Sequence, residues 1–192
     1  MVRHDNNDLE AMIVTLQQQT KSYLNEIKRI LDEHKNPEQI SIVSYFTYSL
    51  DISHNPEQES LCIGSYHVRN MGSQAITNPY VCIKVSNESP FFFSGKYVYE
   101  NFKQSLKAAD GWERINDKTS KEEFWLKPLG KVSIEPNETI SFSNFQITWE
   151  PKQSYAGSIT GLTYSDQLKD GVAVINPINL NGTVHIGEDL NE

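Results

Sequence analysis

Most of the chain beyond residue 40 alternates apolar and polar residues in short stretches that turn residues separate. The longest stretch is Ile40–Ile52, in which every even position except Ser44 is apolar or aromatic. A period of two is typical of a β-strand with one buried face. Further stretches follow at about 155–164, 172–175 and 183–186, without a strand–helix–strand rhythm. The pattern predicts a mainly β protein, an antiparallel β-sandwich of immunoglobulin type.

The stretch Ser60–Ser86 carries two alternating segments around turn residues. We expect a β-hairpin that folds back near residues 74–75, because this register puts an apolar row on one face of the sheet. The expected apolar pairs are Gly64, Tyr66 and Val68 against Val85, Ile83 and Val81, respectively. On the other face the same register places His67 opposite Cys82.

Residues from about Asp8 to His34 show a different period, with apolar residues alternately three and four apart. This spacing predicts one amphipathic helix that ends at Asn36-Pro37. Its apolar stripe has two interpretations: a coiled-coil seam that joins copies of the chain, or a face packed on the chain's own sandwich. The candidate oligomerisation residues are Ile13, Leu16, Tyr23, Ile27 and Ile30.

The segment Ser89–Leu129 departs from the strand pattern, and we interpret it as a mixed helical insertion. Residues 98–109 take helical spacing, and Ser120 with Glu123 fits a capping box that opens a short helical turn. Aromatic residues in an insertion form docking surfaces, or they form a small satellite core that holds the insertion in place. The candidate binding residues are Phe91, Phe92, Phe93, Trp112 and Trp125.

The apolar positions change phase late in the chain, from even at Ile140 and Phe142 to odd at Phe145. This change predicts a β-bulge near Ser143-Asn144. The whole pattern divides the chain into a helix over residues 1–36, a sandwich over 37–187 with the insertion 89–129, and an acidic tail over 188–192. The two cysteines, Cys62 and Cys82, are expected to be free thiols.

The charge balance disfavours a polyanionic partner. Seventeen basic and twenty-five acidic residues give a net charge of −8, and no basic run exceeds two residues. Nucleic-acid and anionic-membrane binding need a basic surface, so neither is expected. The chain as given shows no apolar run of membrane-spanning length and no signal-peptide core, and we expect a cytoplasmic location.

No catalytic or metal-binding motif stands out. The five histidines are scattered without ligand spacing, and we expect no metal and no cofactor. The pair expected from the hairpin, His67 and Cys82, could form a thiolate nucleophile, although no third residue is evident to orient the imidazole. The interpretation we favour is therefore that the protein is not an enzyme, and a small enzyme that uses this pair remains an alternative.

Turn motifs carry a resemblance to a known class. Residues 66–72 (YHVRNMG), 78–81 (NPYV) and 134–139 (IEPNET) resemble a hairpin and turn of bacterial immunoglobulin-like, adhesion-related and CARDB-like β-sandwich modules. The resemblance covers about residues 40–150 and implies a non-catalytic binding role. Together with the helix, it favours a protein-interaction or assembly protein with a protein partner and a possible homo-oligomer. A carbohydrate-binding module is the main alternative.

Overall fold

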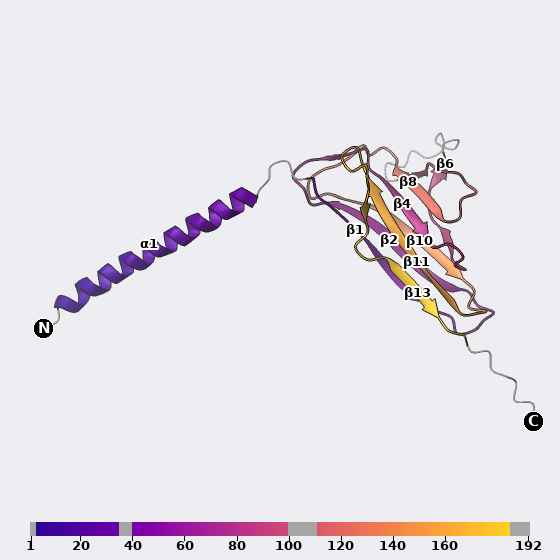
Figure 1. Cartoon of the computed structure of the whole chain (residues 1–192), viewed down its shortest axis with the longest axis horizontal. Coiled ribbons are helices and arrows are strands. Elements are labelled where there is room, and N and C mark those ends of the chain that lie inside the picture. Colours follow the sequence, from indigo (N-terminus) through magenta and orange to yellow (C-terminus); the bar gives the residue numbers. More distant parts are fainter. Residues whose placement is uncertain (1–2, 35–39, 100–110, 185–192) are drawn as a thin grey trace, which may run out of the picture. The chain divides into compact units, whose positions relative to one another are not determined.

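The computed structural model describes residues 3–34, 40–99 and 111–184 (Figure 1). The chain forms two compact units, Met1–Gln39 and Ile40–Glu192. The first contains helix α1 (Arg3–His34), so the predicted helix is present and begins before Asp8. The predicted acidic tail, 188–192, lies outside the described residues.

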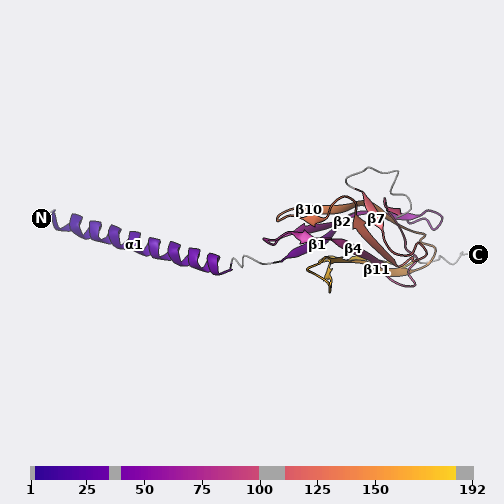
Figure 2. The same ribbon diagram turned by 90° about the horizontal axis from the view of Figure 1, so that it is seen from above.

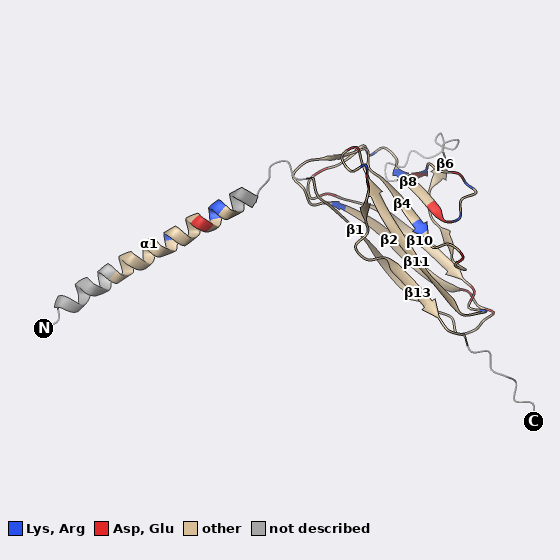
Figure 3. Cartoon of the chain, in the orientation of Figure 1, with Lys and Arg blue, Asp and Glu red and all other residues tan. Residues whose placement is uncertain are grey.

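Helix α1 carries an apolar stripe among polar and few charged side chains. Between residues 12 and 30 the charged side chains are Lys21, Glu26, Lys28 and Arg29 (Figure 3). Arg29 forms an ion pair with Glu26 one turn before it, at 2.6 Å. The large apolar side chains are exposed, and Tyr23 has 70% of its surface accessible. Unit one therefore presents an apolar helix face that no described residue of the same unit covers.

The first sheet of the second unit has four antiparallel strands in the order β1-β2-β10-β5. They are β1 (Ile42–Asp51), β2 (Ser60–Asn70), β10 (Thr139–Trp149) and β5 (Phe92–Ser94). Strands β1 and β2 form a hairpin in which Ile42 pairs with Asn70 and Leu50 pairs with Cys62. The strand predicted over Ile40–Ile52 is thus present as β1, at the edge of this sheet.

The second sheet has the order β12-β11-β4-β8-β7-β6, and β13 also pairs with β11. Its strands are β12 (Val172–Ala173), β11 (Tyr155–Tyr164), β4 (Tyr80–Val85), β8 (Glu123–Pro128), β7 (Trp112–Arg114), β6 (Val98–Tyr99) and β13 (Ile178–Gly182). Only the β6–β7 pair is parallel among these described pairs. Figure 2 shows the two layers, with β10 and β2 on one side and β4 and β11 on the other.

The two sheets enclose one hydrophobic core, so the predicted mainly β sandwich is confirmed. Tyr66 of β2 is fully buried, and its hydroxyl is 2.9 Å from the Thr163 hydroxyl of β11, which joins the sheets through a polar contact. The ring needs the space that Gly161 leaves, since a Cβ there would lie 2.2 Å from Tyr66 Cε2. Close packing of this kind fixes the spacing between the layers.

The predicted Ser60–Ser86 hairpin is wrong. Its two arms are β2 and β4, which lie in different sheets, and the partners of β2 are β1 and β10. The turn residues carry the chain across the sandwich through β3 (Ile76–Thr77), which pairs with β9 (Ser133–Ile134). Local alternation cannot distinguish a strand that folds back from one that crosses to the other sheet.

Asn70 stabilises this crossing. Its side chain is fully buried, and Nδ2 donates to the carbonyl oxygens of Gln74, at 2.7 Å, and Ile134, at 2.9 Å. The backbone N–H of Gly72 donates to Asn70 Oδ1 at 2.9 Å. The amide thus bonds both the turn it begins and the small ribbon beside it. The turn residues of the stretch Ser60–Ser86 therefore do form turns, but these turns lead the chain to the other sheet instead of back along β2.

The predicted bulge is confirmed, since the β10–β2 register shifts between Phe142 and Phe145 and Asn144 has φ of 58°. The described parts of the insertion are strands and the loops between them. Val98 lies in β6, and the remainder of the helix predicted over 98–109 falls mostly outside the described residues. The helical turn expected after Ser120 is wrong: Glu123 N–H donates to Ser120 Oγ, but Glu123 begins strand β8.

Candidate functional site

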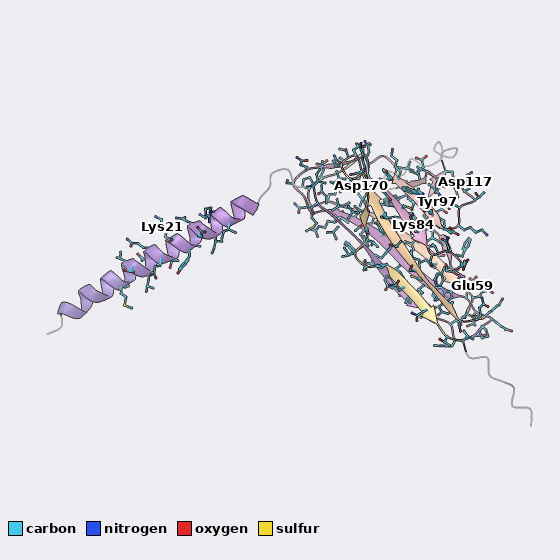
Figure 4. The ribbon with its side chains drawn as sticks, viewed as in Figure 1. Lys21, Glu59, Lys84, Tyr97, Asp117 and Asp170 are labelled. Carbon is cyan, nitrogen blue, oxygen red and sulfur yellow. The ribbon has the colours of Figure 1, made fainter. Side chains whose placement is uncertain are left out.

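A cavity of about 460 Å³ opens within the described part of the insertion. We call it the insertion pocket. Strands β5, β6, β7 and β8 and the loop between β7 and β8 supply its walls, and Figure 4 labels Tyr97 and Asp117 at this end of the sandwich. Its lining residues are Phe91, Phe92, Phe93, Tyr97, Tyr99, Arg114, Lys118, Thr119, Ser120, Lys121 and Phe124.

Arg114 organises the wall formed by the β7–β8 loop. Only 5% of its surface is exposed, and its Nη2 donates to the carbonyl oxygens of Asp117, Ser120 and Glu123 at 3.0, 2.6 and 3.2 Å. The guanidinium also lies over the Phe124 ring, 4.4 Å from its centroid. A planar group with several donors suits this task, because it bonds several carbonyls at once and stacks on an aromatic face.

Alternation along β5 decides which phenylalanine reaches the solvent. Phe91 and Phe93 are buried in the core, whereas Phe92 between them is 63% exposed. Phe93 packs on Phe124 with ring centroids 4.4 Å apart. Two half-buried tyrosines, Tyr97 and Tyr99, form a second aromatic side of the pocket in an edge-to-face pair at 5.8 Å. The pocket therefore has rigid aromatic walls supported by the core.

The described lining of the insertion pocket is basic, although the chain as a whole is acidic. Three of the eleven described lining residues are the cations Arg114, Lys118 and Lys121, and none of those eleven carries a carboxylate. Lys118 Nζ lies 4.4 Å from the centroid of the Tyr99 ring. Cations beside aromatic rings and a shielded wall raise the local potential for an anionic group.

The other two predicted binding aromatics lie elsewhere. Trp112 is buried beside a smaller cavity of about 280 Å³, and its Nε1 donates to the Ser141 carbonyl at 3.0 Å. Trp125 is half-buried on β8, where its ring stacks on Tyr164 at 5.3 Å. Tyr164 also stacks on Tyr80, at 5.2 Å. The five aromatics therefore do not form one surface, and three of them belong to the core.

The Tyr80, Tyr164 and Trp125 cluster bears on the carbohydrate alternative. A sugar platform needs ring faces that are open to a ligand. Here the ring planes are close to parallel, at 8° for Tyr80 and Tyr164 and 30° for Trp125 and Tyr164, and all three side chains are partly buried. A Cβ at Gly171 would also lie 2.5 Å from the Tyr164 ring, so that glycine packs closely against it. The carbohydrate alternative therefore stays a prediction.

The expected pairing of His67 with Cys82 is wrong, because β2 and β4 lie in different sheets. His67 Nδ1 is 2.7 Å from Ser141 Oγ, and its Nε2 is 2.9 Å from Thr47 Oγ1. Partial burial lowers the pKa of His67, which favours the neutral imidazole. Burial raises the pKa of Cys82 to about 12, so its thiol is a poor nucleophile at neutral pH.

The sequence did not indicate Tyr97, Arg114, Lys118 or Lys121 as site residues. Their common signal is weak, because it consists of one aromatic and three basic residues within one insertion, on either side of residues that the structure does not describe. No group of three or more His, Cys, Asp or Glu among the described residues could hold a metal ion. No helix within the described part of the chain is long and apolar enough to cross a membrane.

No family model and no curated protein matches this sequence. Similar solved structures include the CARDB domain of a Pyrococcus furiosus protein in complex with di-metal ions, with 13% identity and a TM-score of 0.36 over 77% of this chain and 90% of that one. A cohesin module of a Clostridium perfringens family 33 glycoside hydrolase has 10% identity and a TM-score of 0.38, covering 74% of this chain and 97% of its own.

A FixG-related protein of Vibrio parahaemolyticus is similar at 10% identity and a TM-score of 0.34, over 73% of this chain and 97% of that one. The similar structures include CARDB and cohesin modules, which are β-sandwiches of the immunoglobulin-like class that the sequence resembles. By its own strand order and core, the chain is a mainly β protein with an antiparallel β-sandwich and an N-terminal helix. Likeness at these TM-scores carries no statement about function.

Proposed function

We propose that the protein is a non-catalytic interaction or assembly protein, in which α1 joins copies of the chain and the sandwich binds a protein partner at the insertion pocket. The observation that carries this proposal is the exposed apolar row on α1. Its members are at least 44% exposed and recur three and four residues apart, except for the seven residues between the second and the third: Ile13, Leu16, Tyr23, Ile27 and Ile30. Such a row is stable in water when another apolar surface covers it.

The interruption of this row at Thr20 is compatible with a helix seam. The Thr20 hydroxyl donates to the carbonyl of Leu16 at 2.8 Å, so its hydrogen is already bonded within the helix. A hydroxyl satisfied in this way costs less to bury between helices than one that loses its water. The seam then extends over four turns of helix from Ile13 to Ile30 without a charged residue at the contact positions.

Light scattering on the full chain tests self-association. We expect a mass that is a multiple of the 21.9 kDa monomer. The double variant Leu16→Lys/Ile27→Lys should have a lower mass than the wild type, because each substitution places a charge in the seam and removes the contact made by α1. Asn25→Lys is the matched control, since position 25 lies opposite the seam on the helix. A wild-type monomer, or a double variant whose mass equals that of the wild type, would show that α1 does not join copies.

The partner expected at the insertion pocket is an acidic protein segment that carries aromatic or apolar side chains. Phe92 offers the exposed ring, and Lys118 and Lys121 offer the charges. Phe91 and Phe93 support Phe92 from the core. An aromatic anchor beside complementary charge is the usual composition of an interface hot spot.

A titration with a Glu–Tyr copolymer tests this site, with a Lys–Tyr copolymer as the charge-reversed probe. We expect the acidic probe alone to bind, and Phe92→Ala and Lys118→Glu/Lys121→Glu each to weaken binding about tenfold or more. Lys127→Glu, on β8 but outside the pocket lining, is the control. Equal binding of both probes, or an equal loss from Lys127→Glu, would contradict the proposal.

A further inference from the structure

Strand β1 is the one long edge strand among those that the structure describes. The other strands at or beside the ends of the two sheets are short: β5 has three residues, β6 and β12 two each, and β13 five, whereas β1 has ten. A long edge strand presents a row of backbone groups to any other strand, and proteins normally cover or charge such an edge.

The first half of this edge is covered. Ile175 N–H donates to the Ser44 carbonyl at 2.9 Å. The Asn176 side chain takes the place of a neighbouring strand: its Oδ1 accepts from Phe46 N–H at 2.8 Å, and its Nδ2 donates to the Phe46 carbonyl at 2.9 Å. These contacts also establish that the backbone groups of even-numbered β1 residues point outward, because alternate residues bond to opposite sides.

The second half of the edge is open. By the same alternation, the backbone N–H and C=O groups of Tyr48 and Leu50 point outward, and no described residue bonds them. The side chains on the same positions are apolar and exposed, at 45% for Tyr48, 40% for Leu50 and 44% for Ile52. The segment contains neither lysine nor proline, and Asp51 is its one charged residue.

We propose that this open edge pairs with the same edge of a second copy, antiparallel about a twofold axis at Leu50. Leu50 then lies opposite Leu50 of the second copy, and Tyr48 lies opposite Ile52. All the exposed apolar side chains meet apolar side chains on one face of the joined sheet. Asp51 meets Ser49 rather than another carboxylate, so no like charges oppose each other.

The covered half of the edge selects this register over its neighbour. A register with the axis at Ser49 pairs Tyr48 with Leu50, and its next pair requires the outward groups of Phe46. Asn176 already bonds both of those groups. The axis at Leu50 uses residues 48–52 alone and lets each outward residue exchange two hydrogen bonds with its partner. The occupant is therefore a strand with this chain's own pattern, and the contact is independent of the helix.

Cysteine cross-linking on the full chain tests the pairing. The background is Cys62→Ala, since Cys62 pairs with position 50 within one chain and would compete for the new thiol. Leu50→Cys should form a disulfide-linked dimer under mild oxidation, because paired residues in neighbouring strands have Cα atoms about 5.5 Å apart. Tyr48→Cys is the matched control, because its two copies lie about 14 Å apart in this register, beyond disulfide reach.

We expect the Leu50→Cys dimer to form at least about tenfold faster than the Tyr48→Cys dimer. A mixture of Tyr48→Cys and Ile52→Cys chains should form the mixed dimer. Equal rates at positions 48 and 50, or a faster link from Ser49→Cys, would overturn the pairing. Adding Leu16→Lys/Ile27→Lys should leave the ratio of rates unchanged, whereas a ratio that collapses with the helix substitutions would also overturn it. Tryptophan fluorescence checks that each variant is folded.

Discussion

Replacing Asn70 with aspartate should strongly destabilise the sandwich. The exchange keeps Oδ1 and its bond from Gly72 N–H, but it removes the Nδ2 donor that bonds the carbonyls of Gln74 and Ile134. Two carbonyl oxygens then face a carboxylate in a fully buried position. An unsatisfied buried group costs about 1–3 kcal/mol and an uncompensated buried charge about 3–5 kcal/mol, so we expect a loss of about 4 kcal/mol at pH 7.

Urea unfolding followed by tryptophan fluorescence measures this loss without interference from α1, because all three tryptophans lie in residues 40–192. Asn70→Ala removes three hydrogen bonds without adding charge and should cost about 3 kcal/mol. Asn179→Asp, on an exposed position of β13, is the control and should change little. The deficit of Asn70→Asp relative to wild type should shrink near pH 4, where the new carboxyl protonates. A change below about 0.5 kcal/mol at pH 7 would refute the reasoning.

Three further predictions concern single contacts. Gly161→Ala should lower the unfolding free energy by about 2–3 kcal/mol in the same assay, since the new Cβ would overlap the buried Tyr66 ring. The pKa of His67 in the folded state is lowered from 6.5. Its contribution to stability is therefore present above pH 6.5 and is lost as the pH falls through the folded-state pKa. His67→Gln should flatten the dependence of the unfolding free energy on pH in that window. Arg114→Met should leave three loop carbonyls without their donor, lower stability by about 3 kcal/mol and speed hydrogen exchange in residues 117–123. Unchanged values in any of these measurements would contradict the corresponding contact.

Periodicity predicted what depends on neighbours in the sequence. The helix, the strand at Ile40–Ile52 and the bulge before Phe145 are local patterns, and the structure contains all three. Strand pairing depends on residues far apart in the chain, and there the prediction failed. Residues 60–86 alternate correctly, but whether their second half folds back or crosses is decided by Asn70 and by Ile134, which lies 64 residues later.

The site was predicted only in outline. The insertion contains the pocket, but aromatic content alone did not separate Phe92 from its buried neighbours Phe91 and Phe93. Composition also did not show that Arg114 donates hydrogen bonds to three carbonyl oxygens, because this role depends on the path of the loop after β7. The spacing of Ser120 and Glu123 predicts a helix start, because an N-cap serine accepts a bond from the N–H three residues later. The same bond, from Glu123 N–H to Ser120 Oγ, is found here at the end of a loop, just before strand β8.

The two buried cysteines make it possible to measure how often each sheet opens to solvent. Cys62 lies in the four-stranded sheet and Cys82 in the seven-stranded one, and both are fully buried free thiols. Burial raises their pKa values to about 11 and about 12. At neutral pH neither thiol reacts with an alkylating reagent until its layer opens to solvent. The alkylation rate of each cysteine, measured by peptide mapping, therefore reports the opening of its own sheet to solvent separately from that of the other sheet.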